Sequence, residues 1–202
     1  MAALSAFSPY ILPEVAGCPT PMIEGATRDG CRRFSEDTWI ITTDVTLATV
    51  ANTQSYTVTP LADTELLAVK TVSIDGAKPI SPIPEDTEKR YVQTPGDPTG
   101  YWFKDDLLWL FPTPQSAASV VVQAVLRPTI TAATVNDKYV EYRDSISAWA
   151  KYQLMSMVGQ PWSNTQEAEY YYRLYRQVTS EQRVREARGR TSIDLRVRPN
   201  FF

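Results

Sequence analysis

The sequence has no histidine among its 202 residues. Histidine is the commonest general base and metal ligand, and the Ser-His-Asp triad requires it, so its absence excludes most kinds of enzyme site. A glycine-rich phosphate loop is also missing, because Gly96 and Gly100 lie in a proline-rich stretch with no helix pattern after them. We therefore expect no enzyme activity, no cofactor and no metal.

Long apolar runs are missing as well. No run of about eighteen apolar residues occurs, as a membrane-spanning helix would need, and the first residues lack the basic start of a signal peptide. Cysteine is scarce: Cys18 and Cys31 could pair, but free thiols are the default in a reducing compartment. These absences predict synthesis in a cytoplasm and no membrane partner.

Charge is unevenly distributed along the chain. Residues 173–202 carry eight arginines against Glu181, Glu186 and Asp194, a net charge of +5. Because the whole chain carries -3, residues 1–172 carry -8. Such an arginine run is usually a solvated helix face, with nucleic-acid binding as the second interpretation.

A helical pattern over residues 136–159 is the element around which we expect the rest of the chain to be organised. Its apolar residues recur at intervals of three and four: Tyr142, Ile146, Trp149, Ala150, Leu154 and Met157. Asn136 and Asp137 can cap its first turn, while Gly159 and Pro161 can end it. The pattern predicts one long core helix.

Two other helices are predicted to cover this one. After an irregular, proline-rich stretch over residues 1–19, Thr20 as cap and Pro21 start a helix that runs to about residue 37. We expect Gly25 and Gly30 in this helix to allow another backbone to approach closely.

The last helix pattern begins at a capping box over residues 163–167 and continues to about residue 188. Tyr171 and Tyr175 lie on its inner face. Because the connection from the preceding helix is short, the two should be antiparallel neighbours.

The middle of the chain changes to a period of two, which predicts strands. The expected strands are 39–43, 56–59, 66–74, 101–103, 107–111 and 120–126. Asp75-Gly76 and Lys104-Asp105-Asp106 mark hairpin turns. Strands this short and numerous are typical of a small antiparallel sandwich or barrel.

Three groups of side chains have both a functional and a structural interpretation. The pairs Asp105-Asp106 and Glu36-Asp37 suggest acid–base or metal chemistry, but turn and helix-end positions explain them better. The aromatic residues of the strands could stack on sugars or bases, although a β-domain core is the favoured explanation: Tyr101, Trp102, Phe103, Trp109 and Phe111.

The end of the chain has an alternating pattern with no remaining sequence to pair it. Ile193, Leu195 and Val197 alternate with Asp194, Arg196 and Arg198, and Phe201 and Phe202 follow. This is the pattern of a half-buried strand, which either docks on a partner, packs on its own β-domain, or frays. In the docked case, the apolar residues and the two phenylalanines would fill pockets and the arginines would orient the strand.

The predicted fold class is α+β: an antiparallel helical bundle with a small antiparallel β-sandwich or barrel inserted into it and an extended C-terminal tail. Residues 1–38 form an N-terminal arm and the first bundle helix, and 39–130 form the inserted β-domain. Residues 131–189 form two long bundle helices, and 190–202 form the docking tail. The bundle core is expected to contain Tyr142, Ile146, Trp149, Leu154, Met157, Tyr171 and Tyr175.

The order of these segments resembles that of the head-to-tail adaptor proteins of tailed bacteriophages, the group that includes the tail tubular protein A of short-tailed phages. The resemblance covers nearly the full length and depends on order and spacing. The segments that carry it are 10–19, 34–39, Ile74-Asp-Gly76, 110–114, 124–128, the central helix and 159–163 with Ala168 and Tyr172.

This resemblance implies a structural virion protein that forms a dodecameric ring between the portal and the tail and completes the DNA exit channel. Its partners would be further copies of itself, the portal protein and a tail or nozzle protein, with DNA passing through without sequence-specific binding. The alternative is a ligand-binding β-module, for carbohydrate or nucleic acid, with a helical oligomerisation domain.

Overall fold

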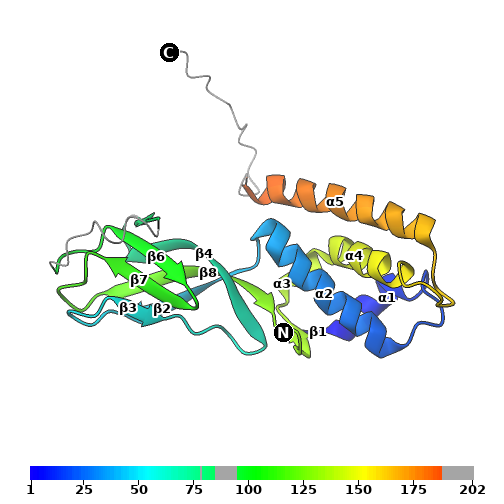
Figure 1. Cartoon of the computed structure of the whole chain (residues 1–202), viewed down its shortest axis with the longest axis horizontal. Coiled ribbons are helices and arrows are strands. Elements are labelled where there is room, and N and C mark those ends of the chain that lie inside the picture. The colour runs from blue at the N-terminus through cyan, green and yellow to red at the C-terminus, as the bar shows by residue number, and fades with distance from the viewer. Residues whose placement is uncertain (78, 85–94, 188–202) are drawn as a thin grey trace, which may run out of the picture. The chain divides into compact units, whose positions relative to one another are not determined.

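The computed structural model describes residues 1–77, 79–84 and 95–187. The fold is mixed α+β, with helices and mainly antiparallel sheets (Figure 1). The chain divides into two compact units. The first, here called the helical unit, contains residues 1–40 and 133 onward, and the second, the β unit, contains Ile41–Ala132.

The helical unit is assembled from both ends of the sequence. Its elements are β1 (Ala2–Ala3), the 3-10 helix η1 (Leu4–Phe7), α1 (Ser8–Ile11), α2 (Thr20–Thr38), β9 (Thr134–Val135), α3 (Lys138–Glu141), α4 (Arg143–Met155) and α5 (Thr165–Ala187). Helix α4 contacts both α2 and α5, so these three helices lie side by side (Figure 1). The short strands β1 and β9 pair in antiparallel fashion.

Helix α2 confirms the predicted first helix, and its buried side includes Ile23, Ala26, Gly30 and Phe34. Its cap differs from the prediction: Thr20 is the first helical residue and Pro19 is the extended residue before it. Gly30 allows the expected close approach, since a β-carbon there would lie 2.9 Å from the carbonyl oxygen of Ile146. The same expectation is wrong for Gly25, where an added β-carbon would meet nothing within 4 Å.

The prediction of a single helix over residues 136–159 is wrong, because the helix is interrupted at Tyr142, between α3 and α4. Tyr142 has φ -106° and ψ 21°, and its amide bonds back three residues to Tyr139. Tertiary contacts hold this geometry: the Tyr139 hydroxyl lies 2.6 Å from that of Ser35, and the Tyr142 ring stacks on Phe34 with centroids 4.9 Å apart. Packing of the two tyrosines therefore overrides the helical period.

The C-terminal end of the predicted central helix is also earlier than expected. Helix α4 ends at Met155, and the backbone amide of Asn164 bonds to the Met155 carbonyl at 3.0 Å. Gly159 is left-handed with φ 81°, but it lies within the loop and does not form the helix end. Met157, expected on the helical stripe, therefore lies beyond the helix and is only partly buried.

The N-terminal stretch, expected to be irregular, contains η1 and α1. Pro9 lies in the first turn of α1, where its missing N–H removes no helical hydrogen bond. The stretch buries Leu4, Phe7, Ile11 and Val15. It therefore contributes to the core of the helical unit.

The β unit contains two sheets. One has the order β2 (Thr42–Ala48), β8 (Ser119–Pro128) and β4 (Thr64–Ile74), all antiparallel. The other has the order β3 (Ser55–Thr57), β7 (Leu107–Phe111), β6 (Gly100–Lys104) and β5 (Ser81–Pro82), in which only the β5–β6 pair is parallel. The predicted strand at 39–43 begins later, at Thr42, because Trp39 ends α2 in the left-handed conformation with φ 56°.

The apolar core of the β unit takes side chains from both sheets. It contains Val58, Val72, Tyr101, Leu108, Leu110, Val120 and Val122. The hairpin expected at Asp105-Asp106 is confirmed, because β6 and β7 pair across it. At Asp75-Gly76 the turn is present, but it leads from β4 to β5 in the other sheet, with only the Val72–Ile80 bridge across it, so the expected hairpin of two paired strands is wrong; all four residues have positive φ. Full burial of a large apolar side chain contributes roughly 1.5–3 kcal/mol, so this cluster stabilises the β unit substantially.

Candidate functional site

An aromatic layer fixes α5 to the rest of the helical unit. The Trp149 ring of α4 lies 5.0 Å from that of Tyr175 and 6.4 Å from that of Tyr172, centroid to centroid. Tyr152 adds an edge contact to Trp149 at 5.4 Å, and the guanidinium carbon of Arg33 lies 5.7 Å from the Trp149 ring centroid. Such pairs add to area burial, so the position of α5 along α4 is well determined.

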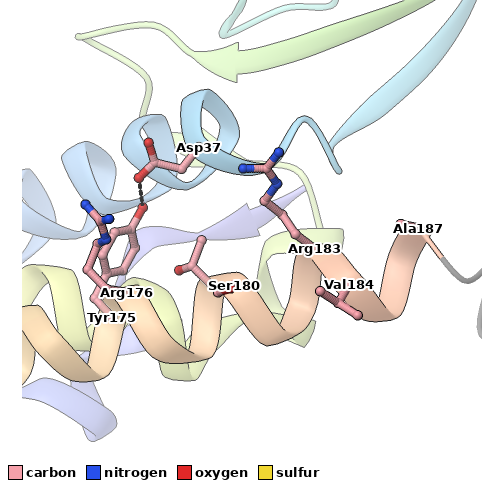
Figure 2. Close-up of a pocket in the computed structure, with 8 residues that line it drawn as sticks. Asp37, Tyr175, Arg176, Ser180, Arg183, Val184 and Ala187 are labelled. Carbon is pink, nitrogen blue, oxygen red and sulfur yellow. Dashed lines mark hydrogen bonds between the residues drawn. The ribbon is translucent and has the colours of Figure 1, made fainter. Parts of the chain in front are cut away.

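A polar contact joins α5 to the end of α2. The Tyr175 hydroxyl donates to Asp37 at 2.7 Å (Figure 2). The same carboxylate oxygen pairs with Arg33 at 3.1 Å. Burial, followed by the hydrogen bond and charge of Asp37, raises the pKa of Tyr175 above its ordinary value. Tyr175 is therefore a neutral donor at physiological pH, and Arg33 compensates the charge of Asp37.

Beyond this contact, α2 and α5 enclose an open groove of about 530 Å³. Its lining residues are Asp37, Tyr175, Arg176, Thr179, Ser180, Arg183, Val184 and Ala187 (Figure 2). Arg176 and Arg183 are exposed, and within the described residues neither has a hydrogen bond or an ion pair. The groove thus presents two uncompensated positive charges beside a buried tyrosine.

A second, smaller crevice lies between the N-terminal stretch, α4 and α5, and its charges are paired. The ammonium group of Lys151 contacts Glu14 at 2.5 Å, and the Tyr171 hydroxyl donates to the same carboxylate at 2.6 Å. Burial raises the pKa of Glu14, but the Lys151 and Tyr171 hydrogen bonds and the Lys151 charge outweigh it and lower the pKa overall. Glu14 therefore links the N-terminal stretch to α4 and α5, and its charge is paired with that of Lys151.

The predicted bundle-core residues lie in the helical unit at different depths. Tyr142, Ile146, Leu154 and Tyr175 are buried, whereas Trp149, Tyr171 and Met157 are partly exposed. The predicted docking residues of the tail lie outside the described residues: Ile193, Leu195, Arg196, Val197, Arg198, Phe201 and Phe202.

Strand alternation separates the aromatic residues of the β unit into two groups. Tyr101 is buried in the core and Phe103 packs against it. Trp102 and Trp109 are opposite each other on the outer face of the sheet, with ring centroids 6.1 Å apart. The Lys104 ammonium lies 5.7 Å from the Trp102 ring centroid, and both rings are half-buried, so this outer pair is a partly exposed aromatic surface.

The remaining chemistry of the described residues is sparse. Cys18 and Cys31 are both free and buried, and burial raises the pKa of each thiol. Within the described ranges, no three acidic or cysteine side chains gather closely enough to hold a metal ion. In the same part of the chain, no helix is both long and apolar enough to cross a membrane.

Sequence reasoning missed the groove because its parts are far apart in the sequence. The sequence favours a helix-end position as the explanation of Asp37, and its hydrogen-bond partner Tyr175 comes 138 residues later. The spacing of Arg176 and Arg183 was visible, since seven residues make two helical turns and place both on one face.

The family model described as SU10 adaptor protein matches residues 20–198. The chain therefore belongs to this family of phage head-to-tail adaptors, which confirms the resemblance and makes it a structural component of the virion. A search of curated proteins found no match.

Proposed function

We propose that this adaptor assembles as a closed homo-oligomeric ring, dodecameric as the family resemblance implies, between the portal and the tail. The ring would complete the DNA exit channel, and DNA would pass through without sequence-specific binding. In this proposal the helical unit acts as a bundle into which the β unit is inserted as a sandwich. The observation that carries it is the family match over residues 20–198, which includes segments of both units.

The surface of α5 supports a role in assembly. In this helix of 23 residues only Ala168, Tyr175 and Thr179 are buried. Tyr170 and Val184 are 59% and 45% exposed, beside several arginines of the same helix. Tyrosine and arginine are enriched in protein interfaces, so neighbouring subunits and the portal are the natural partners of this face.

Native mass measurement tests the ring directly. The protein should give one closed species of defined copy number, alone or after its portal is added, because head-to-tail contacts that close avoid open-ended growth. Micrographs of the same sample should show rings. A chain that stays monomeric at every concentration, with the portal present, would contradict the proposal.

The C-terminal tail supplies a second test. We propose that residues 190–202 dock on the portal or an adjacent subunit as an added strand, with Ile193, Leu195 and Val197 in apolar pockets and Phe201 and Phe202 as anchors. Arg196 and Arg198 would orient it, although exposed ion pairs contribute only about 0–1 kcal/mol each.

Truncation after Arg190 should therefore leave the melting temperature of the subunit nearly unchanged and abolish attachment to the head. Particles should package DNA but leak it or fail to take tails. Infectious particles built from the truncated protein would refute docking. Unfolding of the truncated subunit would instead place the tail in the subunit's own core.

One observation favours the alternative, a ligand-binding β-module. Trp102 and Trp109 form an aromatic pair on the outer face of the four-stranded sheet, with Lys104 over Trp102. Such a surface can stack on sugar rings or bases. Glycan-array binding by the isolated chain, or nucleic-acid affinity that falls steeply with salt, would support this alternative if Trp109→Ala removed it.

A further inference from the structure

The groove on α5 has a charge that the described part of its own chain does not neutralise. Arg176 and Arg183 face it from two turns of one helix, about 10 Å apart along the axis (Figure 2). The Ser180 hydroxyl lies on the same stretch between them. A site of this kind fits a partner with two carboxylates, because arginine binds carboxylates in a paired, directional geometry.

The acidic groups near the groove are already engaged. Asp37 pairs with Arg33 and accepts from Tyr175, at 3.1 and 2.7 Å. On α5, Glu186 accepts from the Tyr142 hydroxyl at 2.8 Å and Glu181 from Gln177 at 3.0 Å. Among the described residues, none of these carboxylates forms an ion pair with Arg176 or Arg183, so these two guanidinium groups are the ones offered to a partner.

The β unit has a matching feature at the turn between β6 and β7. Asp105 and Asp106 are exposed, with φ 51° and 61°, and within the described residues their carboxylates have no hydrogen bond or ion pair. The tip is held firmly, because the Asp106 carbonyl accepts from the Val58 amide at 2.9 Å.

Two adjacent aspartates are an unusual choice for this turn. A two-residue turn with both φ values positive favours asparagine, aspartate and glycine, so the backbone accepts aspartate here, but two adjacent carboxylates repel each other. Uncharged residues would form the turn at least as well, so the fold alone does not explain the two charges. Two adjacent like charges that the turn does not require are a reason to look for a partner of opposite charge.

We propose that the Asp105-Asp106 tip of one copy of this chain binds the groove of the next copy, where it pairs with Arg176 and Arg183. The contact joins two different surfaces, one on each unit, so it is head-to-tail, the kind that generates rings when the rotation closes. This inference rests on the proposed ring and adds the subunit contact that holds it together.

The charges allow a test by exchange. Arg176→Glu with Arg183→Glu, or Asp105→Lys with Asp106→Lys, should each raise the concentration needed for ring formation at least about tenfold, because like charges then face each other. An equimolar mixture of the two variants should restore rings with alternating subunits, since every contact is again between opposite charges. A chain that carries all four substitutions should also form rings.

Matched controls carry the same change of charge elsewhere. Arg185 lies on α5 outside the groove lining, and Asp44 is an exposed residue of β2. Arg185→Glu and Asp44→Lys should leave ring formation within about twofold of the parent protein. Circular dichroism melting of every variant confirms that the units remain folded, and Arg176→Gln with Arg183→Gln should weaken assembly less than the glutamates do.

The possible results separate this inference from the proposed function. If the parent chain forms no ring, alone or with portal, the ring itself is refuted. Rings that form normally with reversed groove charges, or a mixture that fails to restore them, would overturn the tip-in-groove contact alone. If Arg176→Glu with Arg183→Glu lost DNA affinity in a gel-shift assay but assembled normally, the tip-in-groove contact would also be overturned. The two arginines would then be assigned to DNA binding.

Discussion

Replacing Gly30 with alanine should force α2 and α4 apart. The added β-carbon would lie 2.9 Å from the Ile146 carbonyl oxygen and 3.3 Å from the Ile146 Cγ2 atom. Because the nearest atom belongs to the backbone of α4, a side-chain rotation cannot relieve the overlap. Gly25 in the same helix provides the control, since a β-carbon there would meet nothing within 4 Å.

Two contributions of opposite sign determine how much Gly30→Ala changes the free energy of unfolding. Alanine is more favourable than glycine in a helix interior by about 1 kcal/mol, and this applies at both positions. Overpacking costs roughly 1–3 kcal/mol and applies only at Gly30. Gly25→Ala should therefore stabilise by up to about 1 kcal/mol, and Gly30→Ala should be less stable than Gly25→Ala by roughly 1–3 kcal/mol.

Urea unfolding followed by far-ultraviolet circular dichroism measures this difference, provided that the helical unit's transition is separated from that of the β unit. The comparison of the two variants cancels the helix propensity and leaves the packing cost. Equal midpoints for Gly25→Ala and Gly30→Ala, at an unchanged slope, would refute the close approach of α2 to α4.

Two further results are expected. Trp149→Ala should destabilise the fold by about 3 kcal/mol, because the Trp149 ring contacts Tyr175 and Tyr152. This value is at the lower end for removal of an aromatic side chain, since the ring is partly exposed. An unchanged melting temperature would contradict this packing. Burial raises the pKa of both Tyr139 and Tyr175 above the ordinary 10.0. The two neutral tyrosines therefore contribute their full stabilisation of the folded state below pH 10, and this contribution is lost as the pH rises through their folded-state pKa values. An alkaline absorbance titration should show these two tyrosines ionising only with unfolding, and Tyr175→Phe should remove one of them from that step.

Much of the helical unit could be predicted because local rules and tertiary packing agree there. Apolar spacing and the residues at the ends located α2 and the start of α5 to within a few residues. The same reasoning failed at Tyr142, because the contacts of Tyr139 with Ser35 and of Tyr142 with Phe34 join residues about a hundred positions apart. Periodicity carries no information about such contacts.

The candidate site was predictable only in part. The seven-residue spacing of Arg176 and Arg183 placed them on one face, and the turn at Asp105-Asp106 was expected from its composition. What the sequence could not show is which arginines remain unpaired, because that depends on side chains brought in from distant helices. Arg33, for example, is engaged by Asp37.

The way the chain passes through its two units has a consequence for the order of folding. Helices α2 and α4 cannot meet until more than a hundred intervening residues have been synthesised, whereas the β unit is continuous in sequence. When the β unit folds, β2 and β8 pair, and the Leu126 amide bonds to the Ile41 carbonyl at 3.0 Å. This shortens the effective loop that α2 and α4 must close, which lowers its entropic cost by roughly 1–2 kcal/mol. Early folding of the inserted segment would therefore speed the closing of the helices that surround it in sequence.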